Sequence, residues 1–327
     1  MEKIKVTVFA DPVCTWCWGS VPVIRALKYR YGGQLEIGYV MSVMIEDITT
    51  FNDRRAGIGG DIALSNRNIH KAWLEASAVH GMPVCESGYR IFSEERKSTL
   101  PQNRAFVTAT LYARKSNGAI PDVVPLYYLR RIQEATAVDA LITNDVDTLA
   151  DMSAVVGFEP ARFKELYLSH EVDEMLKNDR GHSRSYEVST LPSYIISYRD
   201  EEMMLRGYST YDIVRHCIDQ LSYNGVKPLD DGRELFTADN VKSFMEQYGG
   251  AYPVEIATAF SLERKSGHTA LNAESYLGLS DMMERLADAG EVAMTPRGNG
   301  FMFYNLKAVK KRTGEGWHHE EMRTATI

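Results

Sequence analysis

The chain has 327 residues, of which 44% are hydrophobic and 25% are charged, as is ordinary for a globular protein long enough to form two domains. The formal net charge of -7 argues against a general binder of nucleic acids or anionic membranes, because no basic field gathers phosphates. No apolar run is long enough to span a membrane, and the first residues lead into a predicted strand rather than a leader peptide. We therefore expect a cytoplasmic protein with no nucleic-acid or membrane partner, in a compartment where most cysteines are reduced.

The first predicted elements bring two of the four cysteines to one turn. Residues 4–10 are apolar and rich in β-branched side chains, which is typical of a buried strand. From Val21, apolar residues recur at helical spacing until the glycine pair 32–33 ends the helix. The C-x-x-C motif of Cys14 and Cys17 lies between these elements, on a strand-to-helix turn. Free backbone N–H groups at such a turn favour an anion, and the available anion is the Cys14 thiolate.

A C-x-x-C motif can also be half of a zinc site, which needs a second pair of ligands. The remaining cysteines, Cys85 and Cys217, stand alone, so we predict no metal site and no bound cofactor. Cys217 is predicted to pack in a helix core, whereas Cys85 is either a third redox thiol or a packing residue. His318 and His319 have no partner motif and are assigned to a tail.

After the turn, a second strand is expected at 35–41, parallel to the first through a crossover. Strand patterns then stop, and a block of helices is predicted at 70–80, 102–115, 123–137, 140–152 and 161–176. Strands return at 193–197 and 203–206, and a further helix is expected from Ser209.

A break at 224–228 precedes a C-terminal module. Helices predicted at 238–248, 253–260 and 280–289 come before strands at 291–294 and 301–304, joined by a Gly-rich turn, and this order resembles a winged helix. From Pro228 onward there are 11 Lys and Arg against 15 Asp and Glu, a net charge of -4. DNA readers need phosphate contacts, so a protein-docking or dimerisation role fits this charge better.

The order of strand, helix, strand, helical block, strands and helix is that of a thioredoxin fold with a large helical insertion. The segment from Asp11 to Gly19 resembles the active site of DsbA-family thioredoxin-like oxidoreductases, particularly the cytoplasmic D-P-x-C-x-W-C branch. Residues 190–194 resemble the loop carrying that family's cis-proline, and residues 98–105 and 111–114 resemble its insertion helix. The resemblance covers residues 1 to 224.

We therefore expect an α/β protein with three parts. These are a thioredoxin-like domain at 1–55 and 186–224, a helical insertion at 56–185, and a small α+β winged-helix-like module at 225–327.

The resemblance also assigns roles to individual residues. Cys14 would attack a substrate disulfide, and Cys17 would resolve the mixed disulfide that forms. Thiol–disulfide exchange needs an exposed reactive sulfur and a second thiol close by. Substrate binding is assigned to Trp16, Leu191 and Pro192. A cis X-Pro bond before a strand leaves room for an extended substrate to pair along the backbone. Asp11 is expected to cap the helix start or to exchange protons through water.

The predicted function is that of a thiol–disulfide oxidoreductase, a reductase or isomerase of protein disulfides, with protein clients and a thiol electron donor as partners. The Thr15-Trp16 spacer lacks the histidine of the best-known periplasmic members, so a milder oxidant is expected. Two alternatives stay open. The C-terminal module, also a candidate homodimer interface, favours an adapter that presents clients to a protease or regulator. A glutathione-dependent isomerase is the other, although that branch typically carries serine at the position of Cys14.

Overall fold

The computed structural model describes residues 2–230, 232–246 and 249–307, so His318, His319 and the end of the predicted C-terminal module lie outside the described residues. A four-stranded sheet has the order β2-β1-β3-β4. Its strands are β1 (Ile4–Ala10), β2 (Leu35–Met41), β3 (Ser193–Tyr198) and β4 (Glu201–Arg206). β1 and β2 are parallel, as predicted, whereas β3 runs antiparallel to both β1 and β4.

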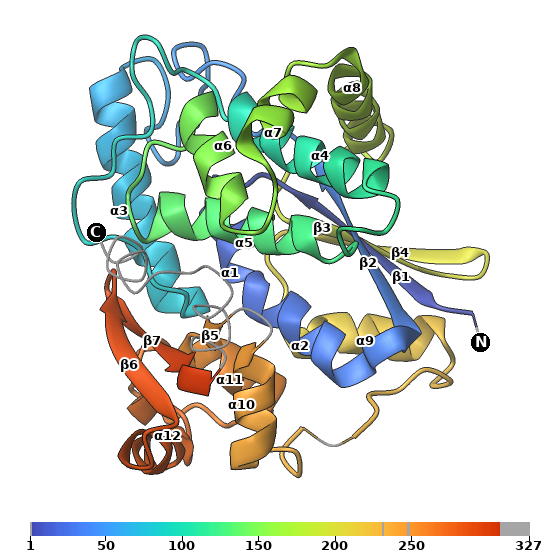
Figure 1. Ribbon diagram of the computed structural model, residues 1–327, viewed down its shortest axis with the longest axis vertical. Coiled ribbons are helices and arrows are strands. Elements are labelled where there is room, and N and C mark those ends of the chain that lie inside the picture. Colours follow the sequence, from blue (N-terminus) through green and yellow to red (C-terminus); the bar gives the residue numbers. More distant parts are fainter. Residues whose placement is uncertain (1, 231, 247–248, 308–327) are drawn as a thin grey trace.

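Two helices follow β1 instead of the predicted single one. α1 (Thr15–Gly19) and α2 (Val21–Tyr31) are separated at Ser20. A continuous helix would need an N–H from Pro22 to bond the Trp18 carbonyl, and proline has none. After α2, the short 3₁₀ turn η1 (Gly32–Gln34) leads into β2. α9 (Tyr211–Leu221) packs against β3 and β4 and begins two residues later than predicted. In Figure 1, α2 and α9 lie below the sheet and insertion helices α4 and α5 above it.

The helices between β2 and β3 form the insertion. They are α3 (Ile62–His80), α4 (Leu100–Lys115), α5 (Val124–Ala137), α6 (Val146–Ala154), α7 (Pro160–Tyr167) and α8 (His170–Ser185). The single helix predicted at 161–176 is wrong, because Ser169 accepts the Val172 N–H at 3.4 Å and starts a new helix. Similarly, α6 begins only at Val146, where the Asp145 side chain accepts the Thr148 N–H at 2.9 Å.

The C-terminal part alternates helices with a small antiparallel sheet of order β5-β7-β6. Its elements are α10 (Ala238–Glu246), β5 (Gly250–Ala251), α11 (Pro253–Ala259), the 3₁₀ turn η2 (Ala273–Ser275), α12 (Leu279–Asp288), β6 (Val292–Arg297) and β7 (Gly300–Asn305). β5 was not predicted, since two residues are too few to show alternation. The β6–β7 hairpin turns tightly at Gly298, whose φ of 54° suits glycine. The likeness to a winged helix stays a prediction.

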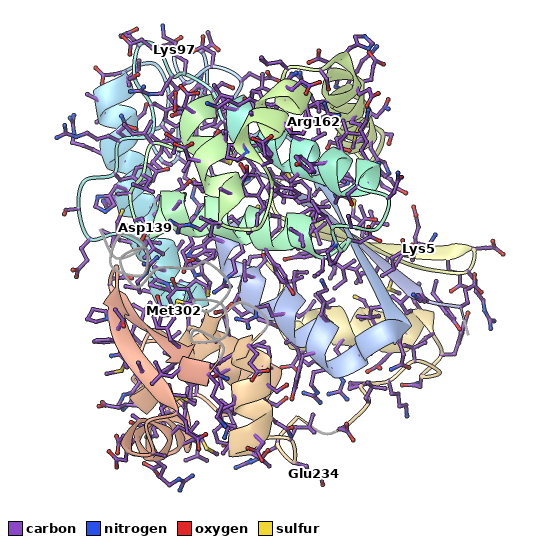
Figure 2. All side chains as sticks on the ribbon, viewed as in Figure 1. Lys5, Lys97, Asp139, Arg162, Glu234 and Met302 are labelled. Atoms are coloured by element: carbon purple, nitrogen blue, oxygen red, sulfur yellow. The ribbon has the colours of Figure 1, made fainter. Side chains whose placement is uncertain are left out.

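This C-terminal part packs closely against the rest of the chain. α11 lies on α2, and Phe244, Phe260 and Leu279 belong to the same apolar cluster as Val6 and Leu27. On the insertion side, Met302 of β7, which is labelled in Figure 2, belongs to a second cluster. This cluster also contains residues of the 82–85 segment and of α5. The break predicted at 224–228 is therefore a covalent linker between parts that share their core.

Candidate functional site

The two cysteines of the motif and the proline loop meet at the start of α1. Cys14 is the N-cap residue, and its Sγ accepts the backbone N–H of Cys17 at 3.3 Å. The Cys14 thiol donates to the carbonyl oxygen of Leu191 at 3.7 Å, although the two residues are 177 positions apart in the chain. The Leu191–Pro192 bond is cis, as predicted. The fold therefore brings both thiols and the proline loop to one place.

The attacking role of Cys14 led us to expect an exposed sulfur, and this expectation is wrong, because Cys14 and Cys17 are both only 4% exposed. The two thiols differ in their chemistry instead. Burial raises the pKa of Cys17, and the adjacent Cys14 raises it further, so Cys17 stays protonated at neutral pH. α1 is a helix of only 5 residues, so fewer aligned peptide dipoles face Cys14 than the predicted longer helix would supply.

Asp11 does not cap α1, because Cys14 occupies the N-cap position. Its fully buried carboxylate instead accepts four hydrogen bonds, two from the backbone N–H groups of Val13 (2.8 Å) and Met44 (2.7 Å) and two from the side chains of Thr99 (2.6 Å) and Asn103 (2.8 Å). Burial raises the pKa of Asp11 against the opposing effect of these bonds. The carboxylate thus ties the turn before Cys14 to the start of α4.

A histidine from the insertion lies beside the C-x-x-C spacer. His80 Nδ1 accepts the Met82 N–H at 3.0 Å, so in the neutral ring the proton sits on Nε2, 3.4 Å from Thr15 Oγ1. Burial lowers the pKa of His80 to about 3, which keeps the ring neutral. The half-buried Trp16 ring lies 5.8 Å from His80 and 5.6 Å from Tyr208. No sequence pattern marks this contact, because His80 and Thr15 lie 65 positions apart.

The residues after Cys17 connect the site to the rest of the molecule. A Cβ atom on Gly19 would lie 2.5 Å from the His80 ring, so only glycine allows this close approach. Trp18 Nε1 donates to the Pro83 carbonyl at 2.8 Å, and the indole packs edge-on against Tyr252 at 5.9 Å. The short helix that carries the thiols therefore contacts both the insertion and the C-terminal part.

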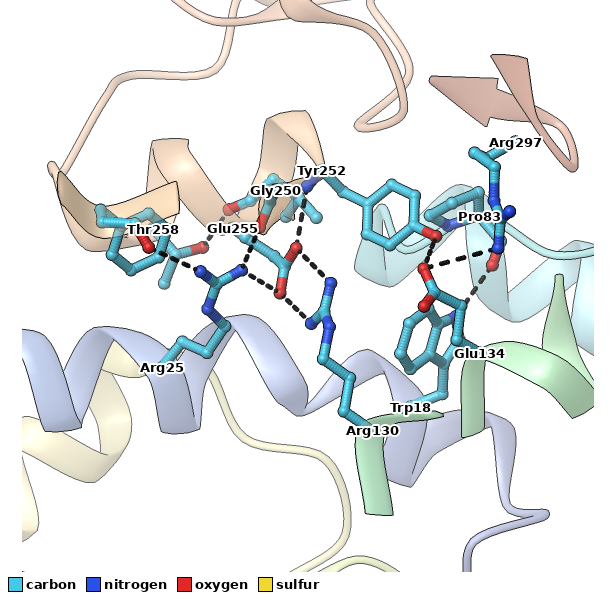
Figure 3. A network of polar contacts seen from close by, with 12 residues as sticks. Trp18, Arg25, Pro83, Arg130, Glu134, Gly250, Tyr252, Glu255, Thr258 and Arg297 are labelled. Atoms are coloured by element: carbon cyan, nitrogen blue, oxygen red, sulfur yellow. Dashed lines mark hydrogen bonds and ion pairs between the residues drawn. The ribbon is translucent and has the colours of Figure 1, made fainter. Parts of the chain in front are cut away.

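A buried ionic network lies next to Trp18 and joins all three parts (Figure 3). Glu255 of α11 is paired with Arg25 of α2 at 2.9 Å, accepts two hydrogen bonds from Arg130 of α5, and accepts the Tyr252 N–H at 2.8 Å. Burial alone would raise the pKa of Glu255, but the charges of Arg130 and Arg25 outweigh it and lower the pKa to about 2. A second contact pairs Arg297 of β6 with insertion carboxylates.

The remaining candidates lie elsewhere. Cys85 is buried in the second apolar cluster and Cys217 in α9, and all four cysteines are free thiols. Among the described residues, no group of three or more His, Cys, Asp or Glu side chains could hold a metal ion. None of the helices in the part of the chain that the structure describes has the length and apolar character needed to cross a membrane.

Known proteins resemble this chain over most of its length. The ClpXP adapter protein SpxH of Bacillus subtilis is 22% identical over 93% of this chain and 90% of its own. The protein of that name from Halalkalibacterium halodurans is 20% identical, covering 80% and 79%. A proposed protein disulfide isomerase from Nitrosomonas europaea has a solved structure with 18% identity and a TM-score of 0.55, covering 68% of this chain and 100% of its own.

The structural likeness confirms the predicted thioredoxin-like fold with a helical insertion. A family model described as thioredoxin matches residues 8–216, from β1 into α9. Because this match extends over more than half of the chain, the protein belongs to the thioredoxin family, as its DsbA-like resemblance predicted.

Proposed function

We propose that this protein carries out reversible thiol–disulfide exchange through Cys14 and Cys17, with protein thiols or disulfides as clients and a separate thiol as electron donor. The observation that supports this proposal most directly is the hydrogen bond from the Cys17 N–H to Cys14 Sγ at 3.3 Å, beside the cis-proline loop. This arrangement holds the resolving thiol next to the attacking sulfur, and the N–H stabilises negative charge on Cys14.

In the reductive direction, the Cys14 thiolate attacks one sulfur of a client disulfide. The client S–S bond breaks, a mixed disulfide forms, and the leaving client sulfur takes up a proton. Cys17 then loses its proton and attacks Cys14 Sγ, which releases the second client thiol and leaves a Cys14–Cys17 disulfide. Two thiol groups of the electron donor then reduce this disulfide: the first attacks it and forms a mixed disulfide with the chain, and the second displaces the chain and leaves as a donor disulfide. The pair returns to two thiols, so each cycle moves two electrons.

Access to the site restricts which clients can react. Cys14 is 4% exposed, and the carbonyl of Leu191 lies 3.7 Å from its sulfur, so a client has to dock along the Leu191–Pro192 backbone to reach it. The half-buried Trp16 lies next to Cys14 and supplies an apolar contact for the client chain. Asp11 acts as a positioning residue rather than a proton carrier, because its oxygens already accept four hydrogen bonds.

Replacing the resolving thiol tests this proposal. A Cys17→Ser variant should accumulate mixed disulfides with clients in cell extract, visible as adducts on non-reducing gels that disappear on reduction. Adding Cys14→Ser should abolish these adducts, whereas adding Cys217→Ser, which removes a buried thiol of α9, should leave them. Adducts that survive loss of Cys14 would contradict the assigned roles, and so would a Cys17→Ser variant that forms none.

A second candidate function is that of an adapter that delivers client proteins to a ClpXP protease in the cytoplasm. It is supported by relatives named as ClpXP adapters, which align over 93% and 80% of this chain and therefore include its C-terminal part. The C-terminal part shares its core with the sheet, so it would present a surface fixed relative to the thiols. In this function the cysteine pair would report redox state instead of turning over.

Protein half-lives distinguish the two functions. An adapter predicts a set of proteins that are stabilised after translation arrest both in cells lacking this chain and in cells lacking ClpX, as measured by quantitative mass spectrometry. A Cys14→Ser/Cys17→Ser variant should restore their degradation if the cysteines only modulate delivery. The absence of any jointly stabilised protein would exclude the adapter function and leave the redox proposal standing.

A further inference from the structure

An apolar groove opens between α12 and the β6–β7 hairpin, remote from the cysteines in the chain. The cavity has a volume of about 290 Å³. Met283, Val292 and Phe303 form its buried floor, while Met294 and Phe301 remain 57% and 37% exposed on the hairpin. In the strand register Met294 pairs with Phe303, so these side chains share one face of the hairpin. The groove is thus built on regular elements.

The charged residues that line this groove all carry the same sign. Glu274 and Glu284 are its charged lining residues, and both are exposed. Asp281 and Asp288 extend the acidic surface along the exposed side of α12. The basic residue of that helix, Arg285, directs its guanidinium toward the sulfur of Met282 at 3.9 Å. A ligand for this groove therefore has to combine apolar surface with positive charge.

The negative charge around the groove disfavours some of the molecules that its apolar floor could otherwise bind. A symmetric pairing with a second copy of this chain would place the same carboxylates against Glu274 and Glu284, and like charges brought together across an interface disfavour binding. A nucleic acid is disfavoured for the same reason, because its phosphates would face an acidic rim. An apolar side chain flanked by cations satisfies both features of the groove.

We propose that the groove binds a partner-protein segment with an aliphatic or aromatic anchor flanked by Lys or Arg. The anchor displaces water from Met294 and Phe301, and the flanking cations pair with Glu274 and Glu284. The inference extends the adapter function and rests on it for the occupant being a protein; it does not require Cys14 or Cys17. Binding of this kind weakens with salt, because the rim carboxylates are exposed.

The test uses the full chain and a short fluorescent peptide of Leu, Phe and Arg, with a second peptide in which Glu replaces Arg. Fluorescence anisotropy should show binding of the basic peptide only, weakening as salt is added. Met294→Asp and the double variant Glu274→Lys/Glu284→Lys should each reduce affinity roughly tenfold or more. Leu168→Asp alters a side chain that is 74% exposed in the insertion and should have no effect.

Several results would overturn the proposal: equal binding of both peptides, binding that the groove variants leave unchanged, or self-association abolished by Met294→Asp. The chain also carries the basic sequence Lys310-Lys311-Arg312. If the wild type fails to bind the basic peptide while the variant Lys310→Gln/Lys311→Gln/Arg312→Gln binds it, the occupant is this chain itself and the proposal of a partner protein is wrong. The half-life measurement tests the adapter function separately, so loss of peptide binding removes only the groove.

Discussion

Replacing Glu255 with glutamine would remove a carboxylate of the C-terminal part that pairs with both Arg25 of α2 and Arg130 of the insertion. Glu255 is 0% exposed and lies between Arg25 and Arg130, which are 1% and 5% exposed. Glutamine keeps the approximate shape but leaves two buried guanidinium groups without their shared counter-charge. Removing one partner of a buried ion pair costs about 3–5 kcal/mol, so we expect a loss of that size in the free energy of unfolding.

The effect should depend on pH in a defined direction. The pKa of Glu255 is lowered from 4.5 to about 2 in the folded protein, so its contribution to stability is fully present above pH 4.5 and is lost as the pH falls toward 2. The difference in stability between the wild type and Glu255→Gln should therefore shrink over this window. Urea titrations followed by tryptophan fluorescence report it directly, because Trp18 lies beside the network (Figure 3).

Two further variants make this prediction refutable. Glu36→Gln changes an exposed carboxylate of β2 and should alter stability little. The triple variant Arg25→Met/Arg130→Met/Glu255→Leu replaces the charges of these three residues with apolar groups and should be more stable than Glu255→Gln alone. A loss below about 1 kcal/mol for Glu255→Gln, or a triple variant that is less stable than the single one, would show that the network does not hold the parts together.

The other predictions concern the thiol site. Alkylation near neutral pH should modify Cys14 before Cys17, because burial raises the pKa of Cys17. Peptide mapping measures the order of modification, and the opposite order would reverse the roles assigned to the two thiols. Equilibration with glutathione buffers should give a potential more reducing than roughly -120 mV, and a value that high would reveal another group stabilising the thiolate. Gly19→Ala should lower the free energy of unfolding by about 1–3 kcal/mol in the same urea titration, because the new Cβ would lie 2.5 Å from the buried His80 ring. Gly33→Ala is the matched control, because open space surrounds its new Cβ.

Local patterns in the sequence were sufficient for the two parallel strands that flank the thiol site, but not for the short helix α1 that carries Cys17. Alternation and β-branched residues identify β1 and β2, and the C-x-x-C motif falls on the turn that follows β1. The proline ahead of β3 marks the loop that meets Cys14. These signals are readable because backbone hydrogen bonding and turn chemistry depend on residues within a few positions of one another. Where a single side chain redirects the backbone, as Ser169 does by starting α8, periodicity alone fails.

Contacts between distant segments were decided only by the tertiary structure. Thr99 and Asn103 reach Asp11 from 88 and 92 positions away, and His80 approaches Thr15 across 65. Glu255 finds Arg130 across 125. In the sequence each of these is one polar residue among many, with no period to mark it. Its partner is set by how helices pack, and burial then decides whether its charge is stabilised, which is why the chemistry around the two cysteines appears only in the folded chain.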